Sequence, residues 1–235
     1  YCREQYKSQY DSLTCENTIT EVFRVNYMQC EVDVTVNRTR CSYIQQGCNN
    51  PINFEIVNIS SVDWDYDYCT TLTGWLFPGY PDNWGALNEY GLKQMLKAIS
   101  SNISIQLFEN ELLQNPNNYQ CDGTTPNCDN PNSCNSFKVV ITQPKCQKLC
   151  IGIKLGATPQ RFYIGYLPCD DNNQSCCVTA IKMCLCGDII KQTITTEPLN
   201  SICTGALPPD GNCSFPPGYV PILSFPNCIA IFGDD

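Results

Sequence analysis

The chain contains no histidine, and this absence removes most of the common catalytic arrangements. Ser-His-Asp and Cys-His sites need an imidazole as general base, and many zinc hydrolases need it as a metal ligand. An enzyme would have to use a pair of carboxylates or a Ser-Lys pair, and candidates such as Glu109 and Glu111 stand in no supporting motif. We therefore expect a protein that is not an enzyme, with a carboxylate-pair hydrolase as the third alternative for its function.

Clustered basic residues and long apolar runs are also missing. The 14 Lys and Arg residues are scattered singly through 235 residues, against 23 Asp and Glu, and the net charge is −9. Phosphate recognition needs grouped basic side chains, so we expect no nucleic-acid partner. The longest apolar runs, such as residues 228–232, are far shorter than the roughly 18 residues of a membrane span, so we expect no membrane insertion.

Cysteine, in contrast, is abundant, with 19 residues of which 13 follow residue 120. Such a content is typical of secreted disulfide-bonded proteins, because a reducing cytosol keeps thiols reduced. A structural zinc cluster is a poor alternative, since the sequence has neither histidine nor a C-x2-C pair. We predict about nine disulfides, no cofactor apart from a weak calcium candidate, and a secreted, extracellular or cell-surface location. Because the sequence begins with Tyr1, a removed signal segment is the simplest expectation.

The cysteine number is odd, so at least one thiol has no partner within the chain. Cys2 lies near a terminus on a stripe of tyrosines and is our candidate for a disulfide to a neighbouring subunit. The alternative is an ordinary bridge from Cys2 to Cys15 within the chain.

The apolar patterning predicts many short strands and one main helix. Residues 2–13 read as a short amphipathic helix, and residues 84–99 as a longer one capped by Asp82 or Asn83. Alternation predicts strands over residues 18–37 (two strands), 52–56, 62–68, 103–107, 137–142, 150–155, 161–167, 177–186, 188–195 and 219–232 (two pieces).

The fold class expected from this pattern is mainly β, either sandwich-like or in two β-rich lobes. One amphipathic helix packs on the sheet, and a short helix lies at the N-terminus. The segment 116–136 is rich in Asn, Pro, Asp and Gly and is predicted to be a disulfide-held loop. It would separate an N-terminal lobe, 1–115, from a cysteine-rich lobe, 137–235; one continuous domain over 1–235 is the alternative.

The segment 61–68 alternates acidic and aromatic residues. Asp63, Asp65 and Asp67 would lie on one face of a strand, roughly 7 Å apart, where they can hold Ca2+ with help from loop carbonyls. The alternative for these carboxylates is a solvated face. The other face would carry Trp64, Tyr66 and Tyr68, either as a ligand platform on which a sugar ring stacks or as the core-facing half of the strand.

Five N-glycosylation sequons begin at asparagines in predicted turns, helix ends or loops, where a glycan is tolerated. They are Asn37, Asn58, Asn102, Asn173 and Asn212.

Three classes of function remain. We expect a structural subunit of an extracellular assembly, a filament, appendage or surface coat, whose partners are copies of itself docked through terminal segments. The alternative is a secreted carbohydrate-binding or protein-binding module, adhesin-like or lectin-like. The third is the hydrolase described above.

Overall fold

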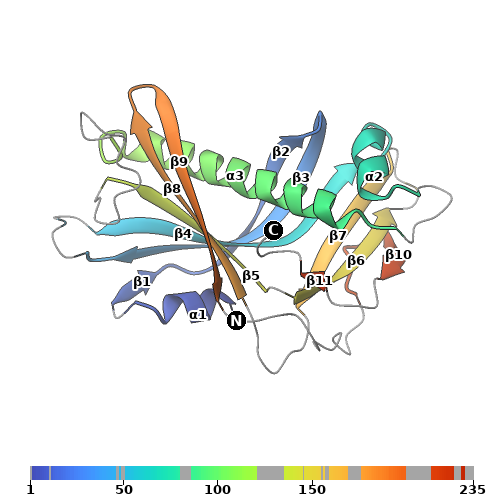
Figure 1. Cartoon of the computed structure of the whole chain (residues 1–235), viewed down its shortest axis with the longest axis horizontal. Helices are drawn as coiled ribbons and strands as arrows, with labels where there is room; N and C mark the ends of the chain where they lie inside the picture. The colour runs from blue at the N-terminus through green and yellow to red at the C-terminus, as the bar shows by residue number, and fades with distance from the viewer. Residues whose placement is uncertain are drawn as a thin grey trace.

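The structure is a computed structural model, shown in Figure 1. It describes residues 2–10, 12–45, 48, 51–79, 86–120, 135–144, 146–154, 156, 159–168, 176–199, 213–224 and 229–230. The prediction of a mainly β fold with one long helix is confirmed, and the described strands form a single mixed sheet of 11 strands. No described helix is long and apolar enough to cross a membrane.

The N-terminal half supplies three helices and the first four strands. In order they are α1 (Cys2–Lys7), β1 (Leu13–Cys15), β2 (Ile19–Tyr27), β3 (Cys30–Tyr43), β4 (Ile52–Asp65), α2 (Thr70–Leu76) and α3 (Glu89–Gln114). Among the described residues of the C-terminal half, the elements are all strands: β5 (Phe137–Pro144), β6 (Cys146–Lys154), β7 (Arg161–Pro168), β8 (Cys176–Cys186), β9 (Ile189–Leu199), β10 (Tyr219–Ser224) and β11 (Ile229–Ala230).

The sheet branches at β4. One edge of β4 pairs with β3 along nearly its whole length, and β3 in turn pairs with β2 and β1. The other edge is divided: residues 54–57 pair with β5 in parallel, and residues 61–65 pair with β7 antiparallel. One wing therefore continues through β5, β8 and β9, and the other through β7, β6 and then β10 and β11.

The long helix α3 lies across one face of this sheet (Figure 1). Its buried side chains recur every three or four residues, which is the spacing of one helix face. They pack with alternate residues of β3 and β4, such as Val34, Val62 and Trp64, in the main apolar core. The opposite face carries a smaller core, in which Tyr6 of α1 packs on Phe54 and Val140.

Several boundaries differ from the sequence prediction for identifiable reasons. The strands predicted over 52–56 and 62–68 are one strand, β4, which ends at Asp65 and is followed by a turn. The strand predicted over 103–107 is wrong, because α3 continues to Gln114 with Ile103 and Leu107 on its buried face. Asn88, not Asp82 or Asn83, caps α3 by accepting a hydrogen bond from the backbone N–H of Gly91 at 2.9 Å. Helix α2 was not predicted.

The strands of the two predicted lobes belong to one sheet. Pairing of β4 with β5 and β7 joins the segment before residue 116 to the segment after residue 136. The loop predicted between them therefore does not separate two sheets, and residues 121–134 of that loop lie outside the described residues.

Candidate functional surface

Asp63 lies on the face of β4 opposite to α3, where charged and aromatic side chains of other strands surround it. Its strand neighbour Trp64 packs in the core beneath α3, so Asp63 points the other way. In the register of the sheet, Asp63 is directly opposite Asp33 of β3 on one side and Tyr163 of β7 on the other. Residues directly opposite in an antiparallel pair share a face, so these three side chains form a row across three strands.

Arg161 holds the two carboxylates of this row together. Its guanidinium donates hydrogen bonds to Asp63 and, at 2.7 Å, to Asp33, while the Tyr219 hydroxyl of β10 donates to the second oxygen of Asp63. Burial raises the pKa of Asp63, although the hydrogen bonds from Tyr219 and Arg161 act in the opposite direction. Burial lowers the pKa of Arg161, but the hydrogen bonds and charges of Asp63 and Asp33 together outweigh burial and raise this pKa above its usual value. The site thus contains a permanently charged cation between two acids.

Two glycines let aromatic rings lie close to the sheet beside this ion pair. A Cβ at Gly165 would lie 2.8 Å from the Tyr163 hydroxyl, and one at Gly152 would lie 2.8 Å from the ring of Phe215. The ring centroids of Tyr163 and Tyr219 are 5.3 Å apart, and those of Tyr163 and Phe215 are 5.9 Å apart. Any larger residue at either glycine would displace a ring.

A disulfide fixes the chain segment that carries Phe215 next to β6. Cys150 of β6 bonds to Cys213, two residues before Phe215. The result is a partly exposed surface with hydrogen-bonding charged groups next to aromatic rings, a combination that suits a polar ligand with apolar faces. We call it the Asp63 surface; it comprises Asp33, Asp63, Arg161, Tyr163, Phe215 and Tyr219.

The calcium arrangement predicted for Asp63, Asp65 and Asp67 is wrong in its geometry, because each carboxylate binds different protein groups. Asp65 accepts hydrogen bonds from the backbone of Asp67 and Tyr68 in the turn after β4. Asp67 has left the strand and accepts from the backbone N–H of Gln160 at 3.0 Å. Within the described ranges, no three acidic or thiol side chains are grouped to hold a metal ion.

The predicted platform of Trp64, Tyr66 and Tyr68 is also not formed. Trp64 is fully buried, stacks on Phe162 and donates from Nε1 to the Thr73 hydroxyl at 2.9 Å. Tyr66 and Tyr68 lie in the turn after β4 rather than on the strand, and Tyr68 is exposed. The core-facing alternative therefore holds for Trp64.

Cys2 forms a disulfide with Cys176 of β8, and Cys15 forms one with Cys41 of β3. Both the predicted link from Cys2 to another subunit and its alternative bridge to Cys15 are therefore wrong. Cys48, Cys184 and Cys186 are disulfide-bonded as well. Several disulfides in one chain are typical of an oxidising compartment.

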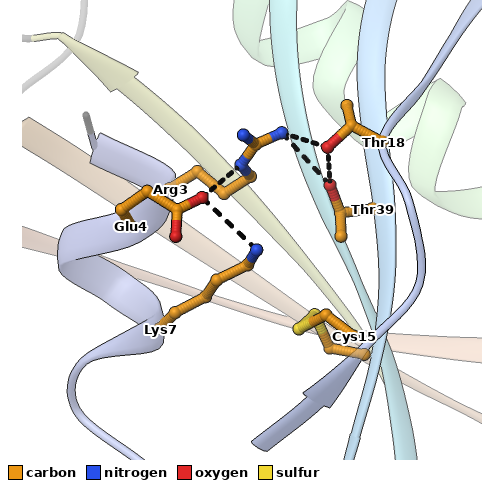
Figure 2. Close-up of polar contacts among 7 residues, drawn as sticks. Arg3, Glu4, Lys7, Cys15, Thr18 and Thr39 are labelled. Carbon is orange, nitrogen blue, oxygen red and sulfur yellow. Dashed lines mark hydrogen bonds and ion pairs between the residues drawn. A yellow bond between two sulfur atoms is a disulfide. The ribbon is translucent and has the colours of Figure 1, made fainter.

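The N-terminal segment is packed on its own chain by further contacts, which Figure 2 shows around α1. Arg3 donates to the hydroxyls of Thr18 and, at 3.4 Å, of Thr39, and it also pairs with Glu4. On the apolar side of α1, Tyr6 is buried and accepts a hydrogen bond from Lys138 of β5 at 2.5 Å. The packing of this segment on its own chain gives no support to docking of the N-terminus on a neighbouring copy, and residues 231–235 at the other end lie outside the described residues.

Three of the sequon asparagines lie in regular elements rather than at their ends. Asn37 and Asn58 are opposite each other in the middle of β3 and β4, and Asn102 lies within α3. The Asn58 amide nitrogen donates to the Thr142 carbonyl at 2.8 Å and to the Gln143 side chain at 3.2 Å. The expected placement in turns or loops is therefore wrong for these three, and Asn173 and Asn212 lie outside the described residues.

A buried ionic network beneath α3 was not predicted. Glu55 of β4 is 1% exposed and pairs with Arg38 at 3.1 Å and Arg40 at 3.6 Å, and Arg40 also pairs with Glu111 of α3 at 2.7 Å. Burial raises the pKa of Glu55 to about 7, although both arginines act in the opposite direction. The only signal in the sequence is that Arg38 and Arg40 continue the alternation of Val32, Val34 and Val36 on the helix-facing side of β3.

The outer edge of β2 is a further surface with the chemistry for binding. Within the part of the chain that the structure describes, β2 pairs only with β3. The two-residue turn between Tyr27 and Cys30 makes these two a hydrogen-bonded pair, so the backbone groups of Thr20, Val22, Arg24 and Asn26 point away from β3. In agreement with this, the Arg24 carbonyl accepts a hydrogen bond from Gln106 of α3 at 2.8 Å.

Comparison of the chain with known protein families, with curated protein sequences and with solved structures finds no significant match.

Proposed function

We propose that the protein is a structural subunit of an extracellular assembly and that it joins neighbouring copies through the outer edge of β2. The disulfides support the compartment, since such bonds persist outside the cytosol. The observation that carries the proposal is the outer edge of β2, a strand of nine residues without proline. Because the N-terminal segment is packed on its own chain, we assign the contact between neighbouring copies to this edge strand.

The physical argument is that an unpaired edge is a template for another strand. The outward N–H and C=O groups of such an edge can pair with a neighbouring strand. On β2 the Arg24 carbonyl is already bonded to Gln106, so the outward groups of Thr20, Val22 and Asn26 are the ones that would pair. Proteins that remain monomeric usually guard long edges with proline, bulges or outward charges. On β2 the outward-facing Arg24 is occupied by ion pairs with Glu31 and Asp33, at 3.5 and 3.3 Å.

Apolar side chains on the same strand add to this argument. Val22 is 62% exposed, and Ile19 at the start of β2 is exposed as well. Pairing with a second copy would bury Val22 beside the strand contact, and burial of an exposed apolar side chain favours association.

The test is a lysine on this edge with a matched lysine elsewhere. Val22→Lys adds a charge to the proposed contact, and Leu113→Lys adds the same charge at an apolar residue of α3 that is 84% exposed. Both side chains are exposed, so neither change disturbs the core. Sedimentation velocity over a hundredfold range of concentration then compares the two variants with the wild type.

We expect oligomers or filaments in the wild type and in Leu113→Lys, and a monomer in Val22→Lys. A wild-type protein that stays monomeric at every concentration, or equal association of all three proteins, would overturn the proposal.

The alternative function, a secreted carbohydrate-binding or protein-binding module, has support from the Asp63 surface. There Arg161 and Asp63 lie beside the half-exposed rings of Tyr163 and Tyr219, and sugars bind to such combinations of aromatic faces and charged groups. A glycan array with the wild type and with Tyr219→Ala tests it. Binding that is lost in the variant supports this function, and an array without any bound glycan removes it for carbohydrates.

A further inference from the structure

Two buried thiols are neighbours at the end of the β2–β3 hairpin and the start of α2. Cys30 is the first residue of β3, and Cys69 immediately precedes α2. Each is 3% exposed, both belong to the main apolar core, and both carry free thiols. The Cys30 thiol and the backbone of Glu31, the residue after Cys30, are near enough to the Cys69 thiol to shift its pKa.

The backbone on both sides of this contact is fixed. The Cys69 N–H donates to the Asp65 carbonyl at 3.0 Å, and its carbonyl accepts from the Thr73 N–H at 3.0 Å. Cys30 is fixed by its pairing with Tyr27 across the hairpin turn. Both thiols are therefore carried by ordered backbone segments, which a disulfide would join.

We infer that Cys30 and Cys69 form a disulfide in the mature protein, which joins the β2–β3 turn covalently to the start of α2. Each thiol loses its proton and one electron as the S–S bond forms. A low-molecular-weight disulfide such as oxidised glutathione takes up the two electrons and two protons and is released as two thiols. The inference does not depend on the proposed function.

The surroundings of the pair favour a bond that forms early in folding. Burial, with the neighbouring Cys30 thiol, raises the pKa of Cys69 to about 12. The thiolate is the nucleophile in disulfide exchange, so the folded dithiol reacts slowly and the exchange has to precede burial.

The bond would also hold a strained turn. Met28 and Gln29 form the two-residue turn beside Cys30, with φ values of 50° and 64°. Such turns normally use Asn and Gly, because positive φ is costly for other residues. A covalent link at Cys30, the residue after the turn, would keep this turn closed.

Peptide mapping of the protein refolded in a glutathione redox buffer tests the inference. Trypsin with Asp-N cuts the chain so that Cys30 lies in peptide 25–32 and Cys69 in peptide 67–81, each without a second cysteine. We expect these two peptides to appear as one linked species that separates on reduction. Recovery of both peptides as alkylated thiols, or each linked to other cysteines, would overturn the inference.

Thiol counting in variants gives an independent measurement. After denaturation without reductant, Cys30→Ala should expose one additional alkylatable thiol at Cys69, Cys69→Ala one at Cys30, and the double variant none. Cys15→Ala, which leaves Cys41 without its partner, is the positive control. The inference fails if the single variants show no additional thiol while the control does.

Discussion

The side-chain amide of Asn58 donates a hydrogen bond to the Thr142 carbonyl at 2.8 Å and thereby joins the middle of β4 to the end of β5. This contact lies where the sheet branches, since β4 pairs with β5 up to Val57 and with β7 from Ser61 onward. Between these two points, side-chain amides take the place of backbone pairing, and the Gln143 amide donates to the Ile59 carbonyl at 3.0 Å. The branch therefore depends on polar side chains as well as on the strands.

Asn58 should accordingly remain without a glycan. A glycan would replace one of the two amide hydrogens that donate to Thr142 and Gln143. Asn58→Ala should lower the free energy of unfolding by about 1–3 kcal/mol, because it removes the donor to the Thr142 carbonyl; the Gln143 oxygen keeps a second donor in Gln147. Asn102→Ala is the matched control and should change stability little, because the Asn102 amide bonds to the Ala98 carbonyl of its own helix rather than across the sheet.

Urea unfolding measures both variants, and glycopeptide mapping of protein from a eukaryotic host measures occupancy. A glycan on Asn58, or equal stability of the two variants, would contradict this account of the branch.

Glu55 should make stability depend on pH near neutrality. Its pKa in the folded protein is about 7 against an ordinary 4.5, so the folded state binds the proton more tightly than the unfolded state does. The resulting stability is fully present below pH 4.5 and is lost as the pH rises through 7, with a total of roughly 3 kcal/mol. Unfolding free energies at pH 5 and pH 8 should therefore differ in the wild type and differ much less in Glu55→Gln.

The pKa of the neighbouring Glu111 is shifted in the opposite direction, so Glu111 affects stability in a different pH range. Burial raises its pKa, but the hydrogen bonds from Arg40 and Tyr119 outweigh burial and lower it overall. Its contribution is present above pH 4.5 and lost below it, outside the window of Glu55. A wild type that is more stable at pH 8 than at pH 5 would show that Glu55 is not the controlling group.

The turn at residues 28–29 should accept glycine with a gain in stability. Gln29 has φ of 64°, so Gln29→Gly removes backbone strain and should raise the free energy of unfolding by about 1 kcal/mol. The converse change in the β8–β9 turn, Gly187→Ala at φ of 63°, should lower it by a similar amount. Thermal unfolding of both variants measures this, and shifts in the same direction would argue against strain as the cause.

Much of the fold could be predicted from the sequence because alternation marks half-buried strands reliably. The seven C-terminal strands lie close to the predicted segments, and the N-terminal helix begins at Cys2 as expected. The errors come from short windows that fit two periods. Ile103, Ile105 and Leu107 alternate as in a strand, yet Ile99, Ile103 and Leu107 also follow a four-residue helix spacing, and packing on the sheet decides for the helix.

The functional surface was less accessible to prediction because its partners are distant in sequence. Asp63 was named as a ligand of a metal, but its partners Arg161 and Tyr219 come from β7 and β10, and only the strand order brings them together. The pairing of Cys2 with Cys176 has the same origin, since connectivity depends on which strands are neighbours. Neither set of partners can be inferred from the spacing of these residues along the chain.

The central claim, association through the outer edge of β2, is tested most directly by hydrogen exchange of its backbone amides at low and high protein concentration. The amides of Thr20, Val22 and Asn26 point away from β3, so a second copy paired along this edge would protect them. We predict that their exchange slows as the concentration rises, while that of the exposed end of α3 around Leu113 stays constant. Exchange of these β2 amides that is equally fast at every concentration would contradict the account.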